Sequence, residues 1–276
     1  SAGVYMAGQA ITFHNEVCSL EELHRRITEE PNRILDASEH REHPVAAVAP
    51  TSRERSIAII GMSAIFPGAK DLSRYWENIL NKTYAIIEVP PERWDLRTYF
   101  DKDPKAPDKI YSRWGGFIDP VEFDPLKYGI PPKSVASIDP YQLMTLEVVD
   151  RALRDAGYHE REFDRKRTSV FVGEGGAVGN LGQLYCLRSL LPMFMENVPE
   201  EVLSQLPDWT EDSFPGLLPN VIAGRIANQY DLGGTNLSTS AACAAGLAAL
   251  SLGIDELVSG KSRMSIVAAV DVQQNP

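Results

Sequence analysis

Cys243 opens a run of small and apolar residues, Cys243-Ala-Ala-Gly-Leu-Ala-Ala-Leu. The pattern predicts a helix from Cys243 to Val258 that is apolar on nearly all sides and therefore buried. A cysteine at the start of a helix feels the positive end of the helix dipole, which favours the thiolate nucleophile. Free amide groups in the same turn can stabilise an oxyanion. Together these features predict acyl transfer through a thioester, and a buried structural cysteine is the competing interpretation.

Two other patterns carry less chemistry. Gly173-Glu-Gly-Gly-Ala-Val-Gly179 superficially resembles a dinucleotide loop, but its glycine spacing differs from GxGxxG, so a tight turn explains it better. Glu211 and Asp212 are adjacent carboxylates, which rarely converge on one substrate and are better explained by helix capping. The three cysteines, Cys18, Cys186 and Cys243, are far apart and show no zinc-ligand spacing. We therefore expect neither a directly bound cofactor nor a metal.

The elements that must position Cys243 alternate along the chain. Short apolar runs predict strands at 56–61, 168–173, 236–240 and 265–270. Apolar periodicity predicts helices at 71–80, 139–157, 213–230 and 243–258. The helix at 139–157 has the strongest end signals, because Asp139 can cap its start, Pro140 fits its first turn and Gly157 ends it. This alternation predicts an α/β fold with a mostly parallel sheet covered on both faces.

The chain changes character near residue 56. Residues 1–36 contain a helical pattern that begins after Ser19, and residues 37–55 are polar and without periodicity. We interpret 1–36 as the helical tail of a preceding domain, 37–55 as a linker and 56–276 as the main domain. The first helix could instead dock on the main domain.

The composition excludes several classes of function. The formal net charge of −11 and the pI near 5.0 argue against binding to nucleic acid or to an anionic membrane. There is no apolar run of 18 residues and no signal-peptide pattern. The odd number of widely spaced cysteines fits a reducing compartment, so we expect a cytoplasmic protein.

Several motifs, in order, resemble the β-ketoacyl synthases of polyketide and fatty acid synthases. Tyr230-Asp-Leu-Gly-Gly followed by Ala242-Cys-Ala-Ala-Gly-Leu is similar to the active-site elbow of that family. Ile57-Ala-Ile-Ile-Gly-Met resembles its first strand, and Asp139-Pro-Tyr-Gln resembles its Asp-Pro-Gln-Gln helix. The resemblance runs from Arg55 to Pro276. The segments 209–216 and 220–228 further resemble iterative synthases of polyunsaturated fatty acids, enediynes and glycolipids.

The resemblance implies a thiolase-like fold, in which a duplicated α/β unit gives αβαβα layers, with this chain as the N-terminal half. It also implies that Cys243 works with two histidines from the second half. All five histidines lie before residue 160 and outside the family's histidine motifs, namely His14, His24, His40, His43 and His159. We therefore expect half an active site, unable to catalyse condensation alone. Ser240 stands where the family carries an aspartate, which puts substrate handling or local packing in doubt.

The implied reaction moves an acyl group from the phosphopantetheine of an acyl carrier protein to Cys243. A decarboxylative Claisen condensation with a malonyl extender follows. The implied partners are the carrier protein, other domains of a large synthase and a second copy of the chain, with the strand at 236–240 near the two-fold axis. Two alternatives stay open: a thiolase-like acyltransferase or decarboxylase that does not condense, and a scaffolding partner. The presence of Cys243 argues against the scaffold.

Overall fold

The computed structural model describes residues 56–175 and 179–271, together with Ser19, Glu21, Glu22, Arg25 and Glu29. By its internal contacts the chain divides into two units, Ser1–Arg55 and Ser56–Pro276. In the first unit Ser19 caps a helix as predicted, because the Glu22 amide donates to the Ser19 hydroxyl at 3.1 Å. The predicted linker at 37–55 lies outside the described residues.

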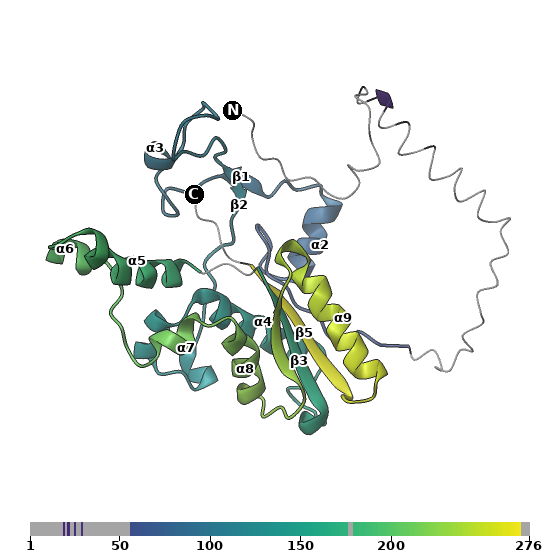
Figure 1. Ribbon diagram of the computed structural model, residues 1–276. Helices are drawn as coiled ribbons and strands as arrows, with labels where there is room; N and C mark the ends of the chain where they lie inside the picture. Colours follow the sequence, from purple (N-terminus) through teal and green to yellow (C-terminus); the bar gives the residue numbers. More distant parts are fainter. Residues whose placement is uncertain are drawn as a thin grey trace, which may run out of the picture. The chain divides into compact units, whose positions relative to one another are not determined.

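Three parallel strands form the central sheet of the second unit, in the order β4-β3-β5 (Figure 1). The middle strand β3, Thr168–Glu174, is buried along almost its whole length. It pairs with β4, Asn236–Ser240, and with β5, Met264–Val270. Three of the four predicted strands are therefore confirmed. The register sets Glu174 beside both Ser240 and Val270, so the three strands end at one edge of the sheet.

Helices cover both faces of this sheet, as the alternating pattern predicted. α4, Pro140–Asp155, and α8, Asn220–Gln229, pack on one face, and α9, Ala245–Val258, packs on the other (Figure 1). The main core lies between the sheet and the first two helices, and its members include Leu146, Val149, Val170, Val172, Ile222 and Ile226. None of the helices in the described part of the chain has the length and apolar character needed to cross a membrane.

The predicted ends of α4 are confirmed. The Asp139 side chain accepts from the Tyr141 amide, Pro140 is the first helical residue, and Gly157 follows the helix in the left-handed conformation with φ +74°. These signals are local, so the sequence alone reveals them.

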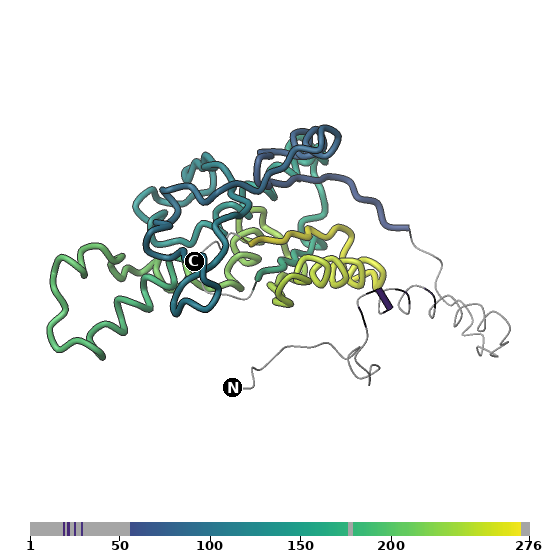
Figure 2. Tube along the Cα trace, turned by 90° about the horizontal axis from the view of Figure 1, so that it is seen from above, coloured from purple at the N-terminus to yellow at the C-terminus, as the bar shows by residue number. Residues whose placement is uncertain are grey.

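Smaller elements surround this framework. α2, Leu72–Leu80, begins after its predicted cap Asp71, and β1, Ile86–Glu88, pairs antiparallel with β2, Trp114–Gly116. Further elements are α3, Leu96–Tyr99; the 3₁₀ helices Pro125–Tyr128, Pro132–Ser137 and Arg165–Arg167; α5, Asn180–Phe194; α6, Glu200–Leu203; and α7, Ser213–Leu217. α5 and α6 project away from the sheet in both views (Figures 1 and 2).

The strand predicted at 56–61 is wrong. This segment forms no strand and is largely exposed, with Ile59 78% accessible. The chain is instead attached to the end of α4, because the Met62 amide donates to the Asp155 carboxylate at 2.8 Å and a Cβ at Gly61 would lie 2.4 Å from the Ala152 carbonyl oxygen. A β-rich run becomes a strand only where a sheet edge is available to pair with it.

The single helix predicted at 213–230 is also wrong, because the structure divides it into α7 and α8. Leu218, between them, is extended at φ −78° and ψ 123°. The reason is Pro219, which excludes the residue before it from the helical region.

The full burial predicted for α9 is wrong as well. Only its sheet-facing side is buried, through the small residues Ala245, Ala249 and Gly253 together with Glu256. Its large apolar side chains face outward, and Leu247 is 73% exposed. Ala and Gly next to the sheet allow close packing, so the apolar bulk of the helix lies on the opposite side.

Candidate active site

Cys243 lies in the turn between β4 and α9. This turn is a single 3₁₀ helix, Ala242–Ala244, and α9 begins two residues after the cysteine rather than at it. Ala242 has a φ of +47°, a left-handed conformation that is unfavourable for a residue with a Cβ. A strained turn from strand to helix lifts the following side chain out of the sheet. The Cys243 side chain is accordingly exposed.

Close packing fixes this elbow against the sheet. A Cβ at Gly173 in β3 would lie 2.3 Å from the Ala245 carbonyl oxygen, so only glycine allows the start of α9 to approach. A Cβ at Gly246 would lie 3.0 Å from that of Ala269 in β5. The first turn of α9 therefore lies directly on β3 and β5, near their carboxyl ends.

The thiol and the backbone amide of Cys243 both lie at the carboxyl ends of the three parallel strands. Within the described residues the amide N–H of Cys243 donates to no protein acceptor, whereas the next amide, that of Ala244, donates to the Ala241 carbonyl at 3.0 Å. A nucleophile beside a free amide is what acyl transfer requires. Ser240, the last residue of β4, presents a neutral hydroxyl here, and Glu174 ends the neighbouring strand.

The structure does not bring His159 to this site. His159 follows α4 on the segment that leads to the amino end of β3, and its imidazole lies 3.3 Å from the Glu160 carboxylate. Cys243 lies beyond the carboxyl end of β4, so the length of the sheet, about 20 Å for a strand like β3, separates the two. His159 is exposed, as predicted. The other four histidines lie outside the described residues, within which no cluster could hold a metal ion.

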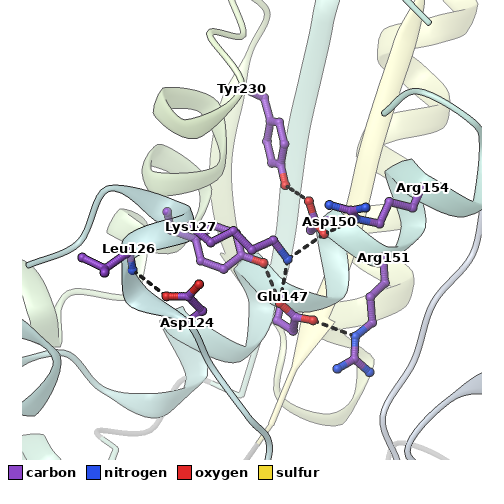
Figure 3. Close-up of polar contacts among 9 residues, drawn as sticks. Asp124, Leu126, Lys127, Glu147, Asp150, Arg151, Arg154 and Tyr230 are labelled. Carbon is purple, nitrogen blue, oxygen red and sulfur yellow. Dashed lines mark hydrogen bonds and ion pairs between the residues drawn. The ribbon is translucent and has the colours of Figure 1, made fainter. Parts of the chain in front are cut away.

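An ion network that the sequence reasoning missed anchors the motif ahead of β4 (Figure 3). The Tyr230 hydroxyl donates to Asp150 of α4 at 3.3 Å. Lys127 lies 2.9 Å from Asp150 and 3.3 Å from Glu147, and the Tyr128 hydroxyl donates to Glu147 at 2.6 Å. Two distant segments, 127–128 and the one that contains Tyr230, therefore meet on one face of α4.

Two arginines complete this network through pairs within α4 (Figure 3). Arg151 contacts Glu147 at 2.9 Å and Arg154 contacts Asp150 at 2.7 Å. Burial alone would raise the pKa of Glu147 and of Asp150, but the hydrogen bonds and charges of Lys127 and its neighbours lower both below their ordinary values. The i,i+4 spacing of these pairs is visible in the sequence, and their more distant partners are not.

A second missed feature is a clamp on the connection from α7 to α8. Gln142 of α4 is fully buried, and its amide donates to the carbonyls of Pro215, Gly216 and Leu218 at 3.1, 2.8 and 3.2 Å. Its oxygen accepts from the Arg225 guanidinium at 2.6 Å.

Two hydroxyls hold the neighbouring carbonyls of the same connection. The Tyr141 hydroxyl donates to Leu217 at 2.7 Å, and the Ser238 hydroxyl of β4 donates to Pro219 at 2.9 Å. Five consecutive carbonyls, 215–219, are thus satisfied by side chains of α4 and β4, which fixes the connection beside the strand that leads to Cys243.

Comparison with known proteins shows the family to which this domain belongs. The family model described as "Beta-ketoacyl synthase, N-terminal domain" matches residues 54–276. The chain belongs to this family. The elbow at Cys243 therefore lies inside a ketosynthase domain.

The relatives are large synthases. A polyunsaturated fatty acid synthase polypeptide of Thraustochytrium sp. is 34% identical over 225 residues, which are 77% of this chain and 8% of that protein. Polyketide synthase PksL of Bacillus subtilis is 31% identical over 222 residues, 80% of this chain and 5% of that protein. The chain thus spans a small part of the relatives that it matches.

Solved ketosynthases share its fold. The oxazolomycin ketosynthase domain OzmH KS7 of Streptomyces albus JA3453 superimposes with a TM-score of 0.62 at 28% identity, over 79% of this chain and 34% of that one. The ketosynthase from module 6 of the bacillaene synthase of Bacillus subtilis gives a TM-score of 0.61 at 27% identity, over 79% and 33%. The predicted thiolase-like α/β fold is confirmed, and the chain spans about a third of each solved ketosynthase.

Proposed function

We propose that Cys243 is the nucleophile of this ketosynthase domain. Its thiolate attacks the carbonyl carbon of an acyl thioester on the phosphopantetheine of an acyl carrier protein. A new thioester forms on Cys243, and the phosphopantetheine thiol leaves with a proton. The observation that carries this proposal is the strained elbow at Ala242. It places an exposed thiol beside a free amide at the carboxyl ends of the strands.

The proposed second reaction is decarboxylative Claisen condensation. A malonyl extender on a carrier protein loses CO₂, its α-carbon attacks the acyl carbon on Cys243, and the cysteine leaves as thiolate. Histidines that stabilise the extender must come from outside the described residues, because His159 is at the far end of the sheet. We assign them to the second half of the thiolase-like fold. The exposed outer face of α9 supports this assignment, since a helix apolar on both sides suits a middle layer.

Several partners and features follow from the same proposal. The carrier protein delivers both substrates, and the protein itself holds no cofactor. The outer edge of β4 is a place for pairing with a second copy, because within the described chain β4 bonds to β3 on one side only.

Residues 1–36 are the tail of a preceding domain of a large synthase, joined by the linker at 37–55. A reducing cytoplasm keeps the thiol free.

A non-condensing acyltransferase or decarboxylase is the second candidate. For this chain alone, the separation of His159 from Cys243 favours this second candidate. Acylation of Cys243 needs only the elbow, whereas condensation also needs histidines. Condensation by the chain without further residues would contradict our assignment of the histidines.

Covalent labelling tests the nucleophile. We expect mass spectrometry to find an adduct at Cys243 after incubation with an acyl thioester or with cerulenin. The adduct should be absent from Cys243→Ala and retained in Cys186→Ala, which removes the other exposed thiol of the described residues. Equal labelling of Cys186 and Cys243 would show general thiol reactivity instead. No adduct on a complete ketosynthase domain would overturn the proposal.

A further inference from the structure

Asp139 is the most deeply buried charged residue in the described part of the chain, at 2% exposed. Its carboxylate accepts from the Tyr141 amide at 3.4 Å and so caps α4. Within the described residues, its Oδ2 is the one buried side-chain nitrogen or oxygen atom that has no hydrogen-bond partner. A buried unpaired oxygen costs free energy, so the packing around Asp139 must hold it in place for a reason other than its own hydrogen bonds.

The beginning of α5 lies against this carboxylate. A Cβ at Gly179, the N-cap residue of α5, would be 2.0 Å from Oδ2 of Asp139. Gly179 offers no side-chain acceptor to the amides of the first turn, and the Leu181 amide hydrogen-bonds to the Asp139 carboxylate instead. Burial raises the pKa of Asp139, and the bonds from Tyr141 and Leu181 oppose this rise. One carboxylate therefore serves the positive ends of two helices.

Two connections near the elbow are joined at Asp139. The segment between β3 and α5 ends at its carboxylate, and the residue before that segment's other end, Gly173, lies against Ala245 at the start of α9. The Asp139 amide also donates to the Gly216 carbonyl at 3.0 Å, at the end of α7. The connection that follows α7 lies beside β4, the strand that leads to Cys243. Asp139 thus holds the chain that follows β3 by its side chain and the chain beside β4 by its backbone.

We propose that Asp139 is a positioning residue of the Cys243 site, which caps α5 from the start of α4 and so fixes the segment between β3 and α5. Its effect passes along the backbone from the start of α5 to Gly173, and from there to Ala245. A cap supplied by another helix requires glycine at position 179, because the side chain of an ordinary N-cap would need the space that the carboxylate fills. The inference rests on the proposed function in taking Cys243 as the reacting group.

Moving the cap from Asp139 to its ordinary place tests this route. The readout is the rate at which iodoacetamide alkylates Cys243 in the full chain, followed by mass spectrometry. Asp139→Ala should lower this rate about tenfold, because small displacements of a reacting group are costly. Gly179→Ser alone should also lower it, since the added Cβ meets Oδ2. The double variant should recover most of the rate, because the new hydroxyl caps α5 where the carboxylate is gone.

Stability separates positioning from a purely structural role. In urea unfolding the double variant should remain less stable than the wild type, because α4 still lacks its cap. A structural role alone would not restore the rate while the stability stays low. Asp164→Ala is the matched control, since Asp164 caps the 3₁₀ helix at the amino end of β3, at the opposite end of the sheet from Cys243. It should lower stability and leave the alkylation rate unchanged.

Asp139→Asn keeps the test decisive if Asp139→Ala does not fold. Asparagine caps α4 as well as aspartate does, but its NH₂ group cannot accept from the start of α5, so it should also slow alkylation. An unchanged or faster rate in the Asp139 variants that fold, or no recovery in the double variant, overturns the proposal.

Alkylation needs no acyl substrate, so the two proposals fail separately. The expected order of alkylation rates without any acyl adduct at Cys243 would overturn the proposed function alone. An acyl adduct together with an unchanged alkylation rate in Asp139→Asn would overturn the present inference alone.

Discussion

Gly173 in β3 lies against Ala245, the first residue of α9, so closely that a Cβ on Gly173 would be 2.3 Å from the Ala245 carbonyl oxygen. No real Cβ contact is that short, so backbone would have to move. The contact decides where α9 begins relative to the sheet, and therefore where the elbow holds Cys243.

Gly173→Ala should accordingly destabilise the protein by about 1–3 kcal/mol, because an added methyl group overpacks a rigid contact. It should also slow alkylation of Cys243 by displacing the elbow. Urea unfolding and the alkylation rate provide the two measurements. Gly224→Ala is the matched control, since nothing lies within 4 Å of its Cβ and it sits inside α8. That variant should be neutral or more stable by up to about 1 kcal/mol.

Ala242 tests the strain of the elbow itself. Ala242→Val should cost about 1–2 kcal/mol and lower the reactivity of Cys243, because a β-branched residue is disfavoured at φ +47°. Ala242→Gly accepts this conformation and should preserve both stability and reactivity. Equal behaviour of the two variants in unfolding and alkylation would show that the left-handed turn is unimportant.

The Gln142 clamp predicts a graded loss of stability. Gln142→Leu removes the side-chain donor to the Pro215, Gly216 and Leu218 carbonyls and the acceptor of the Arg225 guanidinium. The Gly216 and Leu218 carbonyls keep their backbone donors, so the expected cost of about 2–4 kcal/mol comes chiefly from the Arg225 guanidinium, which loses its acceptor. Tyr141→Phe removes one hydrogen bond, to Leu217, and should cost about 1 kcal/mol. Denaturant unfolding of both variants gives the comparison. A smaller loss for Gln142→Leu than for Tyr141→Phe would contradict the clamp.

The ion network predicts sensitivity to acid. The folded protein lowers the pKa of Glu147 and of Asp150, so their stabilising contribution is present above the ordinary carboxyl range near pH 4 and is lost as the pH falls through the folded values. Lys127→Met should reduce stability at pH 7 and flatten this acid dependence. Unfolding free energies between pH 7 and pH 3 measure it. Arg74→Met, whose pair with Glu77 is exposed, should leave the profile unchanged.

The sequence predicted the features that depend on neighbouring residues. The caps of α4, the buried strand β3 and the small residues at the start of α9 are local signals. The strand at 56–61 failed because strand formation depends on a partner edge, which no local pattern contains. The clamp was missed because Gln142 lies in an apolar stripe and its acceptors are more than 70 residues away. Long-range partners of this kind become visible only after folding.

The surroundings of Cys243 were likewise predicted only in part. Its residue type and its place after a strand were readable, and so was the helix that follows. The left-handed turn at Ala242 was not, because alanine is ordinarily a helix former and gives no sign of φ +47°.

The exposed leucines of α9 make the free energy of unfolding of the second unit depend on any protein layer that covers them. A layer that binds this face only in the folded state shifts the folding equilibrium by mass action, in proportion to its concentration and affinity. The melting temperature of the chain therefore measures the occupancy of that face, and a rise in it would register the arrival of a covering layer before any chemistry is assayed.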